Sequence, residues 1–189
     1  MFYAVTLKHI KKIAAAALIL AAAGFIAFLC LNILYPLKHI DIIRHTCAKY
    51  GLDPAFICSL IYSESRFAPY AESKKGASGL MQVTKPTAEW IAGQIGMEGF
   101  DYADIFEPGV NINIGCAYVR RLLDQYAGDP ELALAAYNAG EGNVAKWLTN
   151  PQYSRDGVRL DYIPFGETRG YIKKVMENIN VYRMILKFI

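Results

Sequence analysis

The chain has 189 residues, of which 54% are apolar, and its formal net charge is +3. This length and apolar content suffice for one domain with a sizeable core and exclude a disordered chain. Three of the 20 basic residues precede residue 13, so 17 basic and 17 acidic residues remain in 36–189. A domain with balanced charge has no electrostatic basis for binding nucleic acid.

An uncharged apolar run, IAAAALILAAAGFIAFLCLNILY, extends from Ile13 to Tyr35. Roughly 20 apolar residues span a bilayer as a helix, so the run predicts a transmembrane anchor at 13–35 after a short basic tail at 1–12. A secretory signal peptide is the main alternative, although its apolar core is shorter and small residues follow it. Here the run ends in the bulky FLCLNILYP, which favours an uncleaved anchor over a signal peptide or a buried core helix.

Basic residues flank this run on both sides. Lys8, Lys11 and Lys12 lie close to its N-terminal end, and as many basic residues follow it at a greater distance. Lys and Arg accumulate on the cytoplasmic side of a membrane span. The closer lysines favour a cytoplasmic N-terminus for this single-pass protein, which would place 36–189 outside the cytoplasm.

The residues after Pro36 predict helices joined by turns marked with Gly or Pro. Gly51 is a natural helix stop, and Asp53-Pro54 and Asp129-Pro130 each combine an N-cap with a proline in the first helical position. Helices are expected at 38–50, from 54 to about 67, from near 86, from near 111 to 128, from 130, at about 144–148 and at about 168–187. The stretch 68–83 is expected to be a loop or short hairpin, and 149–166 an irregular loop.

The cysteines show no metal-binding pattern. Cys30 lies in the apolar run, which leaves Cys47, Cys58 and Cys116, and no CxxC spacing occurs. Cys58 is expected to pack as a small apolar residue. An extracytoplasmic location would also allow a Cys47–Cys58 disulfide, and the sequence leaves this pairing open.

All three histidines lie before residue 46. A Ser-His-Asp triad, a Cys-His peptidase and a histidine-ligated zinc hydrolase would each require one within the globular part. An enzyme built from this chain must therefore use carboxylates, tyrosines or lysines for proton transfer.

The stretch SLIYSESRF contains one carboxylate, Glu64, on the apolar side of a predicted helix. Helical spacing aligns it with Ile57, Leu60 and Ile61 behind it and with Phe67 ahead. Desolvation there would raise its pKa from about 4.3 toward the value that a general acid needs at neutral pH. The alternative is a carboxylate that is exposed at the helix end or capped by the next loop.

Three later stretches combine glycines with amide, phenol and carboxyl groups: GASGLMQV at 76–83, AAYNAGEGN at 135–143 and IPFGETRGYIKKV at 163–175. Each could be an ordinary tight turn, a helix C-cap or an N-terminal capping acid. Glycines that let the backbone approach a ligand, beside such polar groups, also suit a sugar-binding groove.

In this order and spacing, the four stretches resemble the soluble-lytic-transglycosylase-like (SLT domain) family of peptidoglycan lyases, glycoside hydrolase family 23. The resemblance covers roughly residues 38–185. Its motifs are matched by Glu64-Ser65, by Gly79-Leu80-Met81-Gln82, by Ala136-Tyr137-Asn138-Ala139-Gly140, and by Glu167-Thr168-Arg169 with Tyr171.

The resemblance implies a mainly α, lysozyme-like (α+β) fold at 36–189 with a long glycan cleft. It implies cleavage of the MurNAc-GlcNAc β-1,4 bond of peptidoglycan without water, which leaves 1,6-anhydroMurNAc ends. A single glutamate would act first as acid and then as base, and no metal or organic cofactor is implied. Peptidoglycan lies outside the cytoplasm, in agreement with the orientation of the anchor.

The resemblance also implies roles for the motif residues. Glu64 would be the acid, with Tyr137 as the hydroxyl partner of that acid or of the reacting sugar. Met81, Gln82 and Asn138 would line the cleft beside Gly79, Leu80, Ala139 and Gly140. Ser65 would orient a peptide stem or the lactyl group. Glu167 and Tyr171 would bind sugar or tie the last helix to the catalytic one.

Two alternatives remain at this point. A muramidase of the same fold would use water and a second acid, for which Glu72 and Glu167 are candidates. A wall-binding or scaffold module would have lost turnover altogether. Endo or exo cleavage, glycan length, stem preference and oligomeric state are not readable from the sequence.

Overall fold

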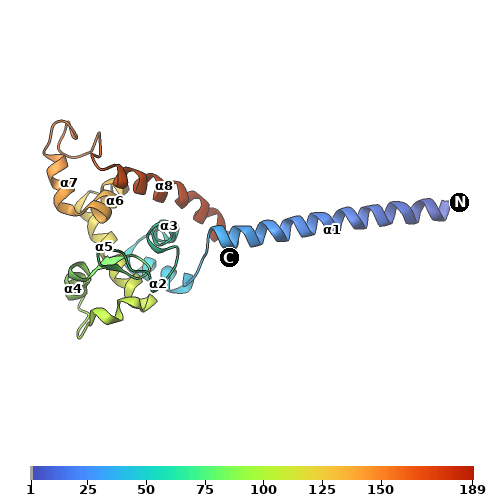
Figure 1. Cartoon of the computed structure of the whole chain (residues 1–189), viewed down its shortest axis with the longest axis horizontal. Coiled ribbons are helices and arrows are strands. Elements are labelled where there is room, and N and C mark those ends of the chain that lie inside the picture. The colour runs from blue at the N-terminus through green and yellow to red at the C-terminus, as the bar shows by residue number, and fades with distance from the viewer. Residues whose placement is uncertain (1) are drawn as a thin grey trace. The chain divides into compact units, whose positions relative to one another are not determined.

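The computed structural model describes residues 2–189, except the side chains of residues 2–8 and 27. The chain divides into two compact units, Met1–Leu37 and Lys38–Ile189. The first unit contains α1 (Phe2–Leu34). The second contains α2 (Ile40–Tyr50), α3 (Pro54–Ser65), β1 (Ala77–Ser78), β2 (Val83–Thr84), α4 (Lys85–Gln94), the 3-10 helix η1 (Tyr102–Phe106), α5 (Pro108–Gln125), α6 (Pro130–Ala139), α7 (Glu141–Leu148) and α8 (Gly166–Leu186). The expectation of a mainly α fold is confirmed (Figure 1).

Helix α1 begins at Phe2, so the residues expected to form a basic tail are part of the same helix as the apolar run. Its segment His9–Leu34 is long and apolar enough to cross a membrane, and none of that segment is buried in the structure. A core helix of a soluble protein would bury its apolar side chains, so this observation argues against the buried-helix alternative.

The expected capping signals form the ends of the helices in the second unit. Gly51 ends α2 at φ 63°, a left-handed conformation that glycine adopts without strain. The Asp53 carboxylate accepts a hydrogen bond from Ala55 N at 2.9 Å, and Asp129 caps α6 in the same way. These two N-caps place the starts of α3 and α6 where the sequence predicts them.

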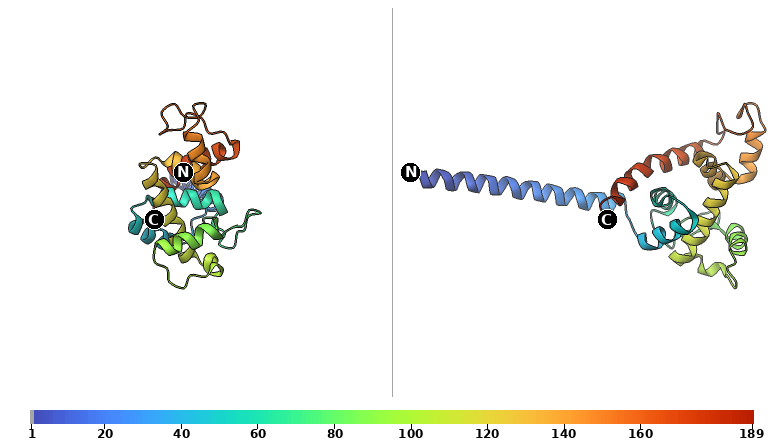
Figure 2. Two further views of the ribbon diagram at one scale, coloured as in Figure 1. Left: turned by 90° about the vertical axis from the view of Figure 1, so that its left-hand side faces the viewer. Right: turned by 180° about the vertical axis from the view of Figure 1, so that it is seen from behind.

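Helix α3 packs against α8, and its residues Ile57, Leu60 and Ile61 are fully buried. The buried Ser59 hydroxyl donates to Val175 O of α8 at 2.6 Å, which sets how the two helices lie along each other. In Figures 1 and 2, α3 and α5 lie in the middle of this unit, between α8 on one side and α4 on the other. The last turn of α3 therefore faces α8.

Helix α3 ends at Ser65, two residues before the predicted end. Arg66 and Phe67 adopt left-handed φ values of 52° and 62°, which are uncommon for residues other than glycine. This reversal directs the Phe67 ring into the core, where it is fully buried 6.1 Å from the ring of Tyr182. Burial of a large aromatic ring outweighs the cost of the backbone conformation.

The stretch expected to be a loop or short hairpin contains the two-residue strands β1 and β2, which pair antiparallel. The turn between them carries Gly79 at φ 80°. Asn111 of α5, which is fully buried, accepts from Met81 N at 2.7 Å and donates to Ser78 O at 3.1 Å and to Ile105 O at 2.9 Å. One amide side chain thus joins the hairpin, η1 and α5.

Besides the end of α3, three helices differ from the sequence-based expectation. Helix η1 was not predicted, and α5 and α7 each begin about three residues earlier than expected, at Pro108 and Glu141. All four cysteines are free thiols, with Cys47, Cys58 and Cys116 buried in the core. The structure therefore shows no bond between Cys47 and Cys58.

Replacing Gly79 by alanine should destabilise the second unit strongly. An added Cβ would collide with the Asn111 side chain and lie 2.7 Å from Ile105 O. We expect a loss of about 3 kcal/mol in the free energy of unfolding. Both tryptophans of the chain, Trp90 and Trp147, lie in this unit, so their fluorescence during urea unfolding in detergent measures it.

Gly76→Ala is the matched control, because Gly76 has a similar φ of 77° but open space around it. It should lose only about 1 kcal/mol, the cost of the backbone conformation. Equal losses of unfolding free energy in the two variants would show that the packing of Asn111 against Gly79 does not contribute to stability.

Candidate active site

Two adjoining hollows form a trough in the second unit. The first, of about 210 Å³, is lined by Glu64, Ser73, Lys75, Ala77, Gln82, Thr84, Tyr137, Asn138 and Glu167. The second, of about 260 Å³, is lined by Gln82, Val83, Thr84, Thr87, Tyr118, Tyr137, Asn138, Ala139 and Gly140. The two hollows share four residues, so they are continuous.

Glu64 lies in the last turn of α3 and is partly buried. The Tyr171 hydroxyl of α8 donates to Glu64 Oε1 at 2.6 Å. Burial raises the pKa of Glu64 to about 7, while the hydrogen bond from Tyr171 and the nearby Lys174 ammonium oppose this rise. The predicted rise in the pKa of Glu64 is confirmed.

A carboxyl group with a pKa near 7 is protonated in a substantial fraction of molecules at neutral pH and can also accept the proton back. Glu64 lines the trough, so a ligand there can reach it. This combination of reach and pKa is what one group needs in order to serve as acid and then as base.

The residue hydrogen-bonded to Glu64 is Tyr171. Tyr137 was expected to be the partner of the acid or of the reacting sugar; it makes no hydrogen bond to the acid, and its role toward the sugar stays a prediction. Tyr137 lines both hollows, but its hydroxyl donates to Met81 O at 2.6 Å. Burial raises the pKa values of both tyrosines well above 10, so both remain protonated donors at neutral pH. The expectation that Tyr171 would tie α8 to the catalytic helix matches the observed bond.

Gln82 and Asn138 lie in the wall that the two hollows share. The Gln82 amide donates to Ala71 O at 2.9 Å and Gly79 O at 3.0 Å, and its backbone has a φ of 48°. Asn138 Oδ1 accepts from Thr168 Oγ1 at 2.8 Å. The Gln82 carbonyl and the Asn138 amino group are therefore the parts of these side chains that remain for a ligand.

The structure does not place five of the expected site residues in the trough wall: Ser65, Gly79, Leu80, Met81 and Tyr171. Ser65 Oγ donates to Leu80 O at 2.7 Å, which ties α3 to the hairpin turn. Met81 is fully buried against Gly115, where no Cβ would fit beside its sulfur, so the expectation that Met81 lines the cleft is wrong. These residues support the wall from behind.

The remaining expected residues do reach the trough. Ala139 and Gly140 line the second hollow, where Gly140 has a φ of 88° and ends α6. Glu167 lines the first hollow, and its exposed carboxylate lies 3.8 Å from Lys75 Nζ. This exposed pair is not a strong interaction in water.

The sequence did not single out several lining residues: Ser73, Lys75, Ala77, Val83, Thr84, Thr87 and Tyr118. Most of them belong to the 68–83 stretch or to α4, where no motif marks them. The Ser73 hydroxyl accepts a hydrogen bond from Ala77 N at 3.0 Å, and so shapes the loop facing Glu64. The signal in the sequence that could have indicated Ser73 was its position in the glycine- and serine-rich loop before GLMQ.

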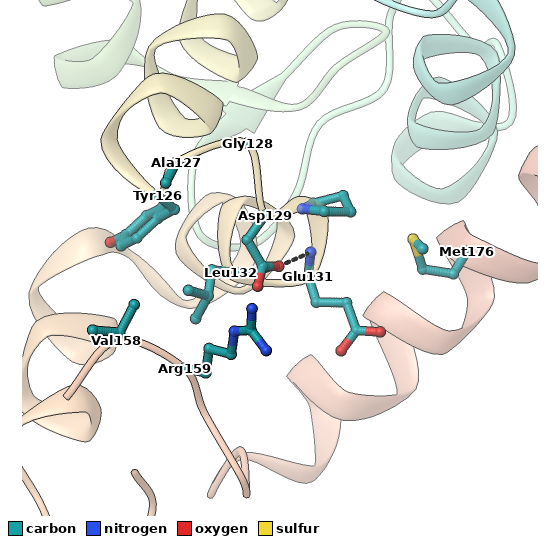
Figure 3. Close-up of a pocket in the computed structure, with 10 residues that line it drawn as sticks. Tyr126, Ala127, Gly128, Asp129, Glu131, Leu132, Val158, Arg159 and Met176 are labelled. Atoms are coloured by element: carbon teal, nitrogen blue, oxygen red, sulfur yellow. Dashed lines mark hydrogen bonds between the residues drawn. The ribbon is translucent and has the colours of Figure 1, made fainter. Parts of the chain in front are cut away.

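A larger hollow, of about 450 Å³, lies elsewhere in the unit, and neither Glu64 nor any motif residue lines it. It lies at the start of α6, beside Val158, Arg159 and Met176 (Figure 3). Its carboxylate Asp129 accepts from Glu131 N and Leu132 N as a helix cap. Among the described side chains, no group of three or more His, Cys, Asp or Glu is arranged to hold a metal ion.

A sequence model described as "Transglycosylase SLT domain" matches residues 41–157. The chain belongs to the transglycosylase SLT domain family. It is 32% identical over 154 residues to the soluble lytic murein transglycosylase of Escherichia coli K12, covering 80% of this chain and 24% of that protein. It is 30% identical over 169 residues to the membrane-bound lytic murein transglycosylase C of Yersinia pestis, covering 77% of this chain and 47% of that protein.

Solved structures of this family share the fold. An inactive variant of lytic transglycosylase Slt from Pseudomonas aeruginosa, in which glutamine replaces a glutamate, superposes with a TM-score of 0.73 at 31% identity and covers 83% of this chain. A 70-kDa soluble lytic transglycosylase in complex with bulgecin A superposes with a TM-score of 0.72 at 30% identity and covers 80% of this chain. These SLT domain proteins confirm the expected lysozyme-like fold. This chain spans about a quarter of the length of both structures.

Glu64→Gln should change how the stability of this SLT domain depends on pH. The folded pKa of about 7 exceeds the ordinary value of 4.5, so the native state binds more protons than the unfolded state between these values. The stabilisation is full below pH 4.5 and is lost as pH rises through 7. We expect the variant to gain stability relative to the unmodified protein from pH 5 to pH 8 in urea unfolding experiments.

Glu98→Gln is the control, since Glu98 is exposed and lies outside the trough. The difference in unfolding free energy between Glu98→Gln and the unmodified protein should stay constant over the same pH range. A constant difference for Glu64→Gln as well would mean that Glu64 is hydrated in the folded protein.

Proposed function

We propose that this protein is a membrane-anchored lytic transglycosylase that cleaves the MurNAc-GlcNAc β-1,4 bond of peptidoglycan and leaves 1,6-anhydroMurNAc ends. The observation that carries the proposal is a single desolvated carboxyl, Glu64, with a pKa of about 7, in the wall of a continuous trough. No metal or organic cofactor enters the chemistry.

Hydrolysis of a glycosidic bond usually needs two carboxylates, one as acid and one as base or nucleophile. Glu167 is the only other carboxylate among the residues that line the two hollows. It is exposed and lies 3.8 Å from Lys75 Nζ, so it is not a shielded nucleophile. This arrangement supports a reaction that does not have to activate water.

In the proposed reaction, protonated Glu64 donates its proton to the bridging oxygen as the bond between that oxygen and C1 of MurNAc breaks. The N-acetyl group of the same sugar stabilises the positive charge that develops at C1. The C6 hydroxyl then attacks C1, and the Glu64 carboxylate takes the hydroxyl proton. Glu64 ends protonated as it began, and no water is consumed.

The neighbours of Glu64 support this cycle. Tyr171 donates to Glu64 and stabilises the carboxylate stage, as the lowering of the Glu64 pKa by this bond indicates. The Tyr137 hydroxyl donates a hydrogen bond to Met81 O, so Tyr137 forms a rigid part of the wall that the two hollows share. Gln82 and Asn138 offer an acceptor and a donor that suit the amide of an N-acetyl group.

The names of the relatives support the substrate class. They include lytic murein transglycosylases, one described as soluble and one as membrane-bound, and an inactive variant carries glutamine in place of a glutamate. The membrane anchor is proposed to be α1, with the N-terminus in the cytoplasm and 38–189 facing the peptidoglycan.

Glu64→Gln should reduce release of soluble muropeptides from purified peptidoglycan by a factor of about 100 or more, the contribution of general acid-base catalysis. The amide keeps the shape of the side chain but carries no transferable acid proton. Mass spectrometry of the products of the unmodified protein should find anhydro ends, 18 Da lighter than reducing ends because no water is added.

Reducing muramic ends would contradict the lyase reaction and leave a muramidase of the same fold. Equal turnover by Glu64→Gln and the unmodified protein would remove Glu64 as the catalyst. If the protein binds peptidoglycan but never cleaves it, a wall-binding module would be the function that remains.

Tyr171→Phe should shift the pH dependence of kcat/KM. Activity requires protonated Glu64, so kcat/KM should fall as pH rises through about 7 in the unmodified protein. Loss of the hydrogen bond to the carboxylate raises the pKa of Glu64, and the fall should move to higher pH. Turbidity clearance of peptidoglycan over a pH series measures this shift.

Tyr137→Phe is the matched variant, because it also removes one phenol from the same region. Its hydroxyl bonds to Met81 O and not to Glu64, so activity should fall without a shift of the pH profile. A shift with Tyr137→Phe and none with Tyr171→Phe would reverse the two assignments.

A further inference from the structure

A row of aromatic rings continues the trough beyond its second hollow. The Tyr137 ring lies 5.3 Å from the ring of Tyr118, which also lines this hollow. The Tyr118 ring in turn lies 6.4 Å from the Trp90 ring, in an edge-to-face arrangement. Trp90 is therefore the next ring after Tyr118, although it does not itself line either hollow.

Trp90 is 41% exposed, although it belongs to a helix that buries its neighbours Ala88, Ile91 and Ala92. The Arg121 guanidinium of α5 lies over its ring, 4.5 Å from the ring centre. A large aromatic side chain is thus held in a defined position while two-fifths of its surface stays in contact with water. A merely structural contact between α4 and α5 would not require this exposure.

The polar groups around Trp90 are also held in place. Arg121 donates to Glu141 Oε2 at 2.9 Å and to Gln125 Oε1 at 2.9 Å. Glu141 directly follows Gly140, which lines the second hollow. The Arg121 guanidinium therefore lies on the exposed ring, and the Glu141 carboxylate is bound to that guanidinium.

This arrangement has the chemistry of a sugar-binding platform. A pyranose ring offers an apolar face of C–H groups that can lie on an aromatic ring, and polar hydroxyl and acetamido groups at its edge. Ligand sites combine aromatic surface with a few well-placed polar groups in this way. Side chains that are already ordered lose little entropy on binding.

We propose that Trp90, with Tyr118, Arg121 and Glu141, forms a distal subsite for a β-1,4-linked N-acetylhexosamine of the same strand that Glu64 cleaves. This inference rests on the proposed function and adds to it a preference for long glycans. Continuity of the trough from Glu64 to Tyr118 favours a polysaccharide over any separate ligand.

A subsite away from the reacting bond binds the ground state and the transition state equally. Removing it raises KM and leaves kcat unchanged. The effect depends on glycan length, because a strand too short to reach Trp90 from Glu64 gains nothing from it.

The first test measures binding in the full-length protein in detergent, in the Glu64→Gln background, where no cleavage occurs. The probes are β-1,4-linked N-acetylglucosamine oligomers, a trisaccharide and an octasaccharide, followed by calorimetry. Trp90→Ala should weaken octasaccharide binding about 5- to 10-fold and leave trisaccharide binding unchanged. Trp90→Phe, which keeps an aromatic ring, should restore most of the loss.

Tyr70→Ala is the control for loss of an exposed aromatic ring, since Tyr70 is 77% exposed and lines neither hollow. It should not change the binding of either oligomer. The second test is kinetic: in the catalytically active protein, Trp90→Ala should raise KM for long peptide-free glycan strands and preserve kcat.

The outcomes separate the two proposals. If Trp90→Ala changes the binding of neither oligomer, or of both equally, the subsite is wrong and Trp90 serves the fold alone, while the proposed function stands. If neither oligomer binds the protein with Trp90 intact, glycan recognition itself fails, and both proposals fall together.

Discussion

The hydrogen bond between Tyr171 and Glu64 joins the two halves of the catalytic arrangement, and the rest of the site is organised around it. It exists because α3 and α8 pack through a dry face, with Ser59 holding the α8 backbone in place. The same packing removes water from Glu64 and raises its pKa to about 7. Desolvation raises the pKa and Tyr171 limits the rise, so the two effects together leave the carboxyl able to give and to take a proton.

The hairpin beside the acid is held by a second device, the buried Asn111 amide. Its three hydrogen bonds fix the turn that follows β1, and Gly79 leaves the space in which Asn111 lies. Met81 fills the gap against Gly115 and presents its carbonyl to Tyr137. Much of the GLMQ motif therefore acts as rigid support, and only Gln82 reaches the trough.

Because its wall is rigid, the trough presents an ordered surface to a bound polysaccharide. The trough extends from Glu64, an acid with raised pKa, to Tyr118, whose ring contacts that of Trp90. Its lining residues come from α3, the hairpin region, α4, α5, α6 and α8. A raised pKa costs stability when the carboxyl ionises, because the native state then carries a poorly hydrated charge. In the proposed reaction, this cost falls at the position where a proton is transferred.

Local signals in the sequence were sufficient for the helices and for the acid. Asp53-Pro54, Asp129-Pro130 and Gly51 act within a few residues of themselves, so their effects can be predicted without the fold. Helical periodicity likewise placed Glu64 among apolar neighbours, and the motifs indicated the family. The end of α3 was misplaced because burial of Phe67, a distant packing effect, overrides the local preference of the backbone.

Contacts between distant parts of the chain could not be obtained in this way. Glu64 and Tyr171 are 107 positions apart, and Tyr137 and Met81 are 56 apart. Which tyrosine meets the acid, whether Met81 faces ligand or core, and where Trp90 lies relative to Arg121 all depend on how whole helices pack. Side-chain spacing along one helix carries no information about the helix opposite, so these features are properties of the assembled core alone.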